Sequence, residues 1–231
     1  SGVTDIRHNS VNNERSASML LEGDVGNYSW HINGFKRITD NMEIPGYARS
    51  KYSRVNEPHE EGEERGSITN SQSNSDGITI GLSKFFDKGY IGISVTNYDS
   101  NYGIIGHEHE EEEGEEHEHS DPNITLDLKQ QRIDIAGLYE NPTDFIKEVK
   151  YKVGFSDYEH IEFEDETAAN IFKNSGYSSR IEFIHNKFAS FEGAFGLQAN
   201  KSEFSASGEE TFIPPTETYT NSVFLFEEID L

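Results

Sequence analysis

The residues with the clearest chemical potential form a thirteen-residue run, HEHEEEEGEEHEH, from His107 to His119. The run contains four histidines, eight glutamates and one glycine. Imidazole nitrogens suit zinc, copper and nickel, and carboxylate oxygens can complete the coordination shells of these ions. The composition predicts loose and rapid binding of divalent metal, with His107, His109, His117 and His119 as the main ligands.

The alternative interpretation of this run is a solvated acidic loop. Glutamate-rich stretches repel themselves and usually stay hydrated without any ligand. The two His-X-His pairs favour metal binding, because glutamate alone would provide solubility while paired imidazoles provide ligands. An unperturbed imidazole has a pKa near 6.5, and protons compete with zinc for its nitrogen. We therefore expect zinc capture by the run to weaken below about pH 6.

Composition narrows the class of protein. The chain has 231 residues, of which 33% are hydrophobic, so the supply for a conventional core is thin. The formal charge of -24 makes nucleic acid an unexpected partner, since phosphate binding needs a basic surface. There is no cysteine, which excludes disulfides, thiolate zinc sites and a cysteine nucleophile. The chain contains no run of eighteen apolar residues, so no transmembrane helix is expected. The N-terminus lacks the pattern of a signal sequence.

The chain alternates between apolar and polar residues, as half-buried strands do. In 77–86, for example, Ile78, Ile80 and Leu82 lie on one face and the intervening polar residues on the other. A slip of the apolar phase between Leu128 and Ile133 predicts a β-bulge. About nine strands are expected, in 16–25, 28–38, 77–86, 90–98, 124–140, 145–156, 178–186, 191–200 and 221–231.

The connections between these strands alternate in length. Short turns are expected at 26–27, 87–89, 141–144 and 187–190, where Gly, Asn, Asp and Pro supply turn conformations. Long polar stretches are expected at 39–76, 99–123, 158–177 and 201–220. Short turns on one side and long loops on the other are typical of an outer-membrane β-barrel, whereas soluble sandwiches and propellers have more even loops. The His/Glu-rich loop 99–123 is then extracellular.

The expected fold is therefore all-β: an antiparallel transmembrane β-barrel, of which this sequence supplies about nine strands of a larger plugged barrel. Residues 1–15 are a leading segment, and residues 16–231 carry the strands and loops. Both the first fifteen residues and the ending FLFEEIDL have the character of a longer chain that has been cut.

Several motifs resemble the TonB-dependent outer-membrane receptors of the ZnuD type, which import zinc in Gram-negative bacteria. In chain order these motifs are IPGYA at 44–48, YGIIG at 102–106, QR at 131–132, SDYEHIE at 156–162 and GEETFIPPT at 208–216. The resemblance covers most of the chain. It implies a 22-stranded barrel closed by an N-terminal plug, although neither the plug, a TonB box nor the last strands occur in this sequence.

The resemblance also implies a route for the ion. Zinc would be captured by the histidine run and then descend to a deeper site that includes His160 and Glu162. These two residues share one parity on an extended strand and can project together into the lumen. The remaining ligands, and the coupling to TonB, would come from the plug. A hydrogen-bonded lumen histidine without a metal is the alternative for His160.

Three other functions are alternatives to zinc uptake. A soluble or surface β protein could buffer divalent ions without transport, with the histidine run as its whole function. An enzyme is not expected, because the chain has no nucleophile elbow, P-loop, dinucleotide motif or HExxH. Haem uptake would also use histidine ligands, but the dense carboxylates oppose an anionic porphyrin.

Overall fold

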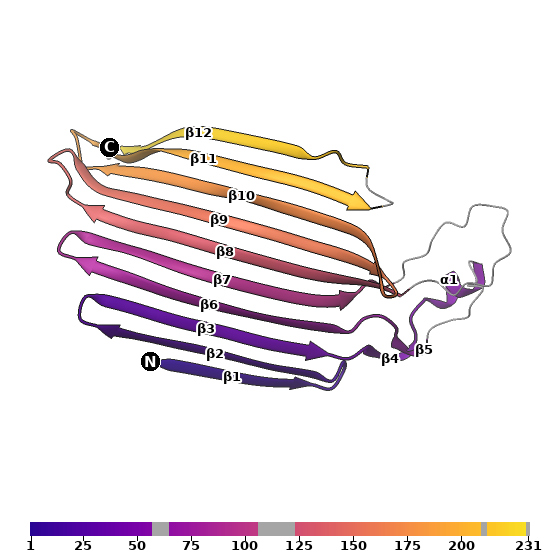
Figure 1. Cartoon of the computed structure of the whole chain (residues 1–231). Coiled ribbons are helices and arrows are strands. Elements are labelled where there is room, and N and C mark those ends of the chain that lie inside the picture. Colours follow the sequence, from indigo (N-terminus) through magenta and orange to yellow (C-terminus); the bar gives the residue numbers. More distant parts are fainter. Residues whose placement is uncertain (57–64, 106–122, 209–211, 230–231) are drawn as a thin grey trace.

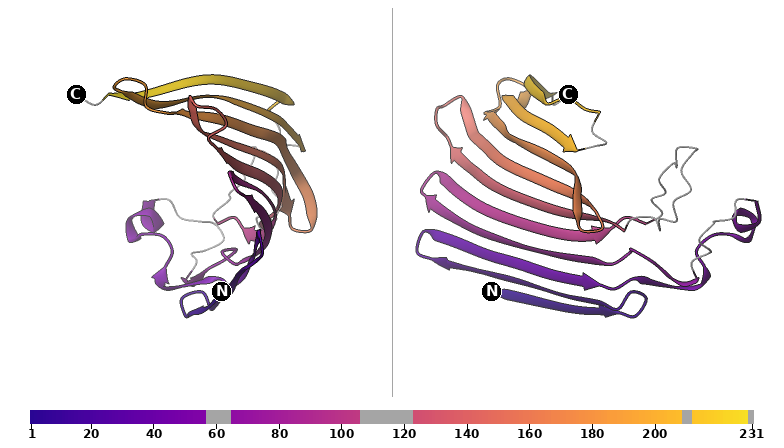
Figure 2. Two further views of the ribbon diagram at one scale, coloured as in Figure 1. Left: turned by 90° about the vertical axis from the view of Figure 1, so that its left-hand side faces the viewer. Right: turned by 45° about the vertical axis from the view of Figure 1, so that its right-hand side comes forward.

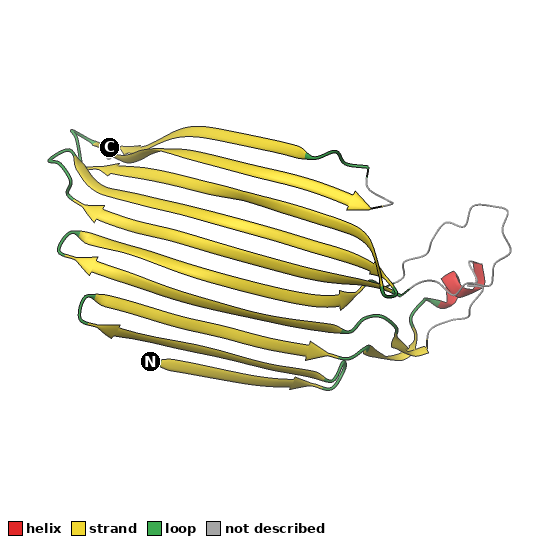
Figure 3. Cartoon of the chain, viewed as in Figure 1, coloured by secondary structure: helices red, strands yellow, loops and turns green. Residues whose placement is uncertain are grey.

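The computed structural model describes residues 1–56, 65–105, 123–208 and 212–229 (Figure 1). His107, His109, His117 and His119 lie outside these ranges. The described residues are almost entirely strand and short turn, as Figure 3 shows. The described helix, α1 (Lys51–Asn56), has six residues. No described helix is long and apolar enough to cross a membrane.

Ten strands form one continuous antiparallel sheet in the order β1-β2-β3-β6-β7-β8-β9-β10-β11-β12. The sheet is a single curved layer, concave on one side and convex on the other (Figure 2). A small second sheet, β4 (Met42–Tyr47) with β5 (Arg65–Ile68), stands at one end of the large one. The strands of the large sheet are β1 (Gly2–Asn9), β2 (Glu14–Val25), β3 (Tyr28–Thr39), β6 (Ser73–Phe86), β7 (Gly89–Gly103), β8 (Ile124–Glu140), β9 (Ile146–Glu164), β10 (Thr167–His185), β11 (Phe191–Gly208) and β12 (Thr216–Ile229).

The prediction of an all-β antiparallel fold is confirmed, and the four predicted short turns all occur. The large sheet contains ten strands rather than about nine. The additional strand is β1, which lies inside the leading segment 1–15 and pairs with β2 along its whole length. Its sequence, GVTDIRHN, has too few apolar residues to show alternation.

The prediction of a long loop at 158–177 is wrong. Strands β9 and β10 continue through this stretch and meet at a tight turn, where Asp165 has a positive φ of 54°. The residues around this turn, among them Glu162, Glu164 and Asp165, have the composition of a loop although the two strands are paired there.

The predicted bulge between Leu128 and Ile133 is also wrong. The pairing of β8 with β7 and with β9 runs without a register shift over this region. Leu128 and Ile133 lie on opposite faces of a regular strand, and both faces accept an apolar residue there. The structure instead has irregularities in the β9–β10 pairing, at Ala168/Asn170 and at Ile184/His185.

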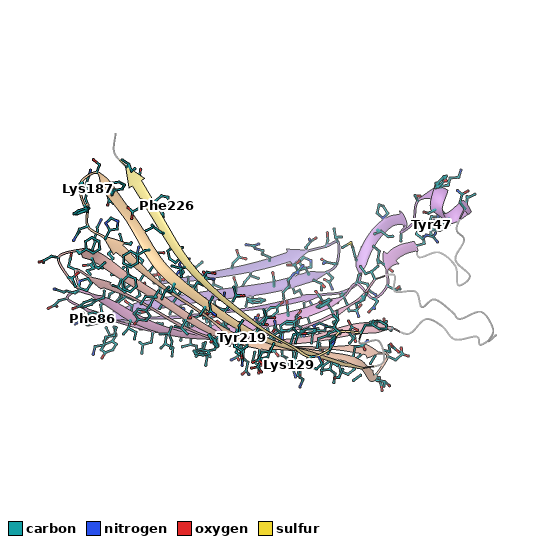
Figure 4. All side chains as sticks on the ribbon, turned by 90° about the horizontal axis from the view of Figure 1, so that it is seen from above. Tyr47, Phe86, Lys129, Lys187, Tyr219 and Phe226 are labelled. Atoms are coloured by element: carbon teal, nitrogen blue, oxygen red, sulfur yellow. The ribbon has the colours of Figure 1, made fainter. Side chains whose placement is uncertain are left out.

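The convex face carries a continuous apolar band. One row of hydrogen-bonded partners on this face consists of Ile32, Ile80, Val95, Ile133, Phe155 and Tyr177, from six adjacent strands. Figure 4 places Phe86 and Lys129, which share the parity of this row, on the convex side. Nine apolar residues of the band are 41–53% exposed: Ile78, Ile80, Leu82, Ile91, Ile93, Val95, Ile133, Phe155 and Leu197.

The concave face is polar. The corresponding row there consists of Thr79, Thr96, Arg132, Ser156 and Gly176. Among the described residues, the buried apolar side chains are only Ile124 and Leu126, near the end of the sheet that carries the long loops. A single layer with an exposed apolar face and a polar opposite face cannot be stabilised in water by such a core, so its apolar band needs another apolar environment.

Candidate functional site

The structure shows how the ends of the His/Glu-rich loop are held. Asn70, in the connection between β5 and β6, donates from Nδ2 to the carbonyl oxygens of Ile104 (2.8 Å) and Ile124 (2.6 Å). The amide of Ile104 also donates to the carbonyl of Ile124 at 3.0 Å. Gly103 permits this contact, because a Cβ there would lie 2.0 Å from Asn70 Oδ1. Hydrogen bonds therefore hold residues 104 and 124 close together at the base of the loop.

His160 and Glu162 lie on the concave face of β9, as their shared parity predicts. His160 pairs across the sheet with Leu128 of β8 and Phe172 of β10. Its Nε2 is 4.0 Å from Glu162 Oε1, and the two side chains are 23% and 27% exposed. The structure therefore brings these two predicted residues together.

Neighbouring side chains fix the orientation of the His160–Glu162 pair. The hydroxyl of Tyr158 shares a hydrogen bond of 2.9 Å with His160 Nδ1, and the ring of Phe172 lies 4.5 Å from the imidazole ring. Asn170 Nδ2 donates to Glu162 Oε2 at 3.0 Å. If Nδ1 carries the proton and donates to Tyr158, then Nε2 keeps its lone pair toward Glu162 and can bind a metal.

The sequence analysis gave no role to Tyr158 or Asn170. Tyr158 could have been found, because it has the parity of His160 and lies two residues before it. Asn170 could not, because its place opposite Glu162 depends on the irregularity between Ala168 and Asn170.

The pair does not complete a metal shell. Within the described ranges, no group of three or more His, Cys, Asp or Glu side chains could hold a metal ion. Zinc sites in proteins usually take three or four protein ligands. His160 and Glu162 can thus supply two ligands, and a tight site needs others from outside the described residues.

A polar hollow of about 370 Å³ lies next to this pair on the sheet. Its lining includes Tyr158, Arg132, Ser156 and Asn174, and it is shaped by Gly176, which has no side chain. Arg132 donates from Nε and Nη2 to the two carboxylate oxygens of Asp134, both at 2.7 Å. The Arg132–Asp134 ion pair and the neutral side chains around it make this part of the concave face hydrophilic. The residues that line the hollow include no unpaired carboxylate.

His185 has a structural environment. It is 4% exposed, stacks on Phe145 with ring centroids 5.5 Å apart, and its Nδ1 lies 2.8 Å from the carbonyl of Asn186. Its Nε2 contacts the carboxylate of Glu227 on β12. These contacts join the ends of three strands at the short-turn side.

Comparisons with solved structures define the class of fold. The FrpB iron transporter from Neisseria meningitidis (F3-3 variant) is similar to this chain with a TM-score of 0.63 and 13% sequence identity. The similarity covers 89% of this chain and 30% of the transporter. The outer-membrane expressed OmpT of Vibrio cholerae matches with a TM-score of 0.44 and 12% identity, over 98% of this chain and 63% of that one. No protein-family model matches.

The fold is therefore an all-β, ten-stranded antiparallel sheet that resembles part of an outer-membrane β-barrel. The chain spans less than a third of the length of the transporter it matches. In barrels of this class the convex face meets lipid and the concave face lines the lumen.

Proposed function

We propose that this chain is part of an outer-membrane receptor that takes up a divalent metal ion, zinc, and that His107, His109, His117 and His119 capture the ion. The observation that carries the proposal is the His160–Glu162 pair on the lumenal face, at the end of the sheet that also bears the histidine-rich loop. The likeness to an iron transporter supports a transport barrel, and the ion itself is inferred from the ligand types.

In this proposal uptake has two stages. The run captures zinc weakly from dilute solution, aided by the negative field of the chain. The ion then passes to His160 and Glu162, where Tyr158 orients the imidazole. The remaining ligands, and the TonB complex that drives release, act through a plug domain. Outer-membrane lipid surrounds the convex face.

Zinc titration by calorimetry on the full-length receptor in detergent tests both stages. Replacing His107, His109, His117 and His119 together by Ala should remove weak sites and leave one tight site. The double variant His160→Ala, Glu162→Gln should do the reverse. His8→Ala, on the convex side of β1, is the control. Unchanged titrations for the first two variants would reject the proposal.

The alternative is a β protein that buffers metal without transport. The exposed convex band disfavours its soluble form, because so much contiguous apolar surface is unusual in water. Zinc accumulation by cells separates the two functions: the receptor raises uptake at low external zinc, whereas a buffering protein changes only the amount bound at the surface.

A further inference from the structure

A row of charged residues crosses the convex face above the apolar band. It consists of Lys36, Asp76, Asp99, Lys129, Glu159 and Lys173, which are hydrogen-bonding partners on the adjacent strands β3, β6, β7, β8, β9 and β10. Each member lies four residues toward the long loops from a member of the apolar row that runs from Ile32 to Tyr177. The two rows therefore have the same parity and face the same side.

The depth of the charged row can be derived from strand geometry. Four residues span about 13 Å along a strand. With the usual barrel tilt of about 40°, this is roughly 10 Å along the membrane normal. The headgroup layer is about 5–8 Å thick on each side of the hydrocarbon. The next row toward the loops is polar, with Asn97, Gln131 and Asp157, so we take the apolar row as the edge of the hydrocarbon. The charged row then lies at the outer boundary of the headgroups, and a lysine side chain can reach back into them.

The lysines of this region differ in their partners. Lys173 is paired with Glu159 at 2.7 Å, and Lys201, on β11 nearby, is paired with Glu217 at 2.6 Å and with Glu203. Lys36 and Lys129 form no ion pair with any residue that the structure describes, and both are exposed. Both lysines therefore remain available to an external anion.

We propose that Lys36 and Lys129 bind the phosphate groups of membrane lipid headgroups and so fix the depth of the barrel in its leaflet. The occupant is lipid-borne phosphate, because the lysines continue a surface that already faces lipid. Each lysine near an anionic membrane surface contributes about fivefold in affinity. The intervening Asp76 and Asp99 oppose binding of phosphate anywhere along the row other than at its lysines.

A ladder of ion pairs between strands is the competing explanation. Lys36 lies opposite Asp76, and Lys129 lies opposite both Asp99 and Glu159. Such a ladder would stabilise the sheet equally in every lipid, and exposed pairs of this kind contribute little. Phosphate binding, in contrast, makes the effect of the lysines depend on the lipid supplied.

The test uses the full-length receptor in maltoside detergent, titrated with phosphatidylglycerol and followed by native mass spectrometry and thermal unfolding. The double variant Lys36→Gln, Lys129→Gln should lose affinity for this lipid by about tenfold or more. The matched control, Lys150→Gln with Lys152→Gln, removes the same charge from the concave face of β9 and should bind lipid like the wild type.

Three results would overturn the proposal. The first is equal lipid affinity of the double variant and the wild type. The second is an equal loss in a phosphate-free galactolipid, which would indicate the ion-pair ladder. The third is stabilisation of the wild type, but not of the double variant, by inorganic phosphate alone at the same concentration, which would make free phosphate the ligand. Zinc binding does not enter this test, so its outcome is independent of the proposed transport function.

Discussion

The two faces of this sheet are built from the same strands, yet they have opposite chemistry. On the convex face, Val95 and Ile133 are cross-strand partners in an exposed apolar band. On the concave face, the next residues of the same two strands, Thr96 and Arg132, are partners in a polar row, where the Thr96 hydroxyl lies 2.9 Å from that of Thr79. The difference shows that strand alternation in this chain separates an exposed apolar surface from a polar one, rather than a core from solvent.

The largest expected effect comes from placing a charge on the convex face. Ile93→Arg puts a guanidinium near the middle of the apolar band and should destabilise the full-length receptor in lipid by about 2–4 kcal/mol. Ser94→Arg, one residue further on the same strand, points into the concave side and should cost much less. Urea unfolding in lipid vesicles measures both. Equal losses for the two variants would mean that the two faces do not meet different environments.

Lowering the pH should weaken zinc binding by the histidine run while leaving lipid binding by the convex face nearly unchanged. The expected effect is smaller than that of Ile93→Arg. Between pH 7.5 and pH 5 the imidazoles of the histidine run become mostly protonated, so each competing proton should lower zinc affinity by roughly thirtyfold. The sign follows from the metal's need for a neutral imidazole: affinity is highest above the imidazole pKa and falls as the pH decreases. Calorimetry at the two pH values measures this loss.

The convex face provides the comparison for this titration. Lysine keeps its charge at both pH values, so the binding of phosphatidylglycerol should change little between them. Equal zinc affinity at pH 5 and pH 7.5 would reject histidine as the main ligand of the run.

The sequence predicted the alternating faces and the short turns because both depend on local residue types. Ile78, Ile80 and Leu82 already define the convex side of β6, and the turn residues lie where the structure has its hairpins. The prediction failed at 158–177, because the charged residues near the turn, such as Glu162, Glu164 and Asp165, have the composition of a loop although the strands are paired there. It also failed to place β1, whose pairing with β2 is a long-range property.

For the candidate site, the sequence supplied the pair but not its surroundings. Parity alone placed His160 and Glu162 on one face. The contact of Phe172 with the imidazole, and that of Asn170 with Glu162, depend on the register between β9 and β10. The hydrogen bonds of Asn70 to Ile104 and Ile124 join the β5–β6 connection to both ends of the β7–β8 connection, and no local pattern predicts them.

The smallest expected effect comes from removing the hydroxyl group of Tyr158 on the concave face. Tyr158→Phe removes the hydrogen bond to His160 Nδ1 while keeping the aromatic ring. Partners that orient a metal-binding histidine typically contribute 10–100-fold in affinity, so zinc binding at the deeper site should fall about tenfold. The measurement is clearest in a receptor whose four histidines of the run are already Ala, because the deeper site then titrates alone.

Tyr177→Phe is the matched control for this variant. Tyr177 lies on the neighbouring strand β10 but on the convex face, where it is the cross-strand partner of Phe155. Loss of its hydroxyl should leave zinc affinity unchanged. If both variants behave like the wild type, the ring of His160 is held by Phe172 and the backbone rather than by Tyr158. If both weaken zinc binding, the effect is transmitted through the stability of the sheet, and the two faces are not functionally separate at this depth.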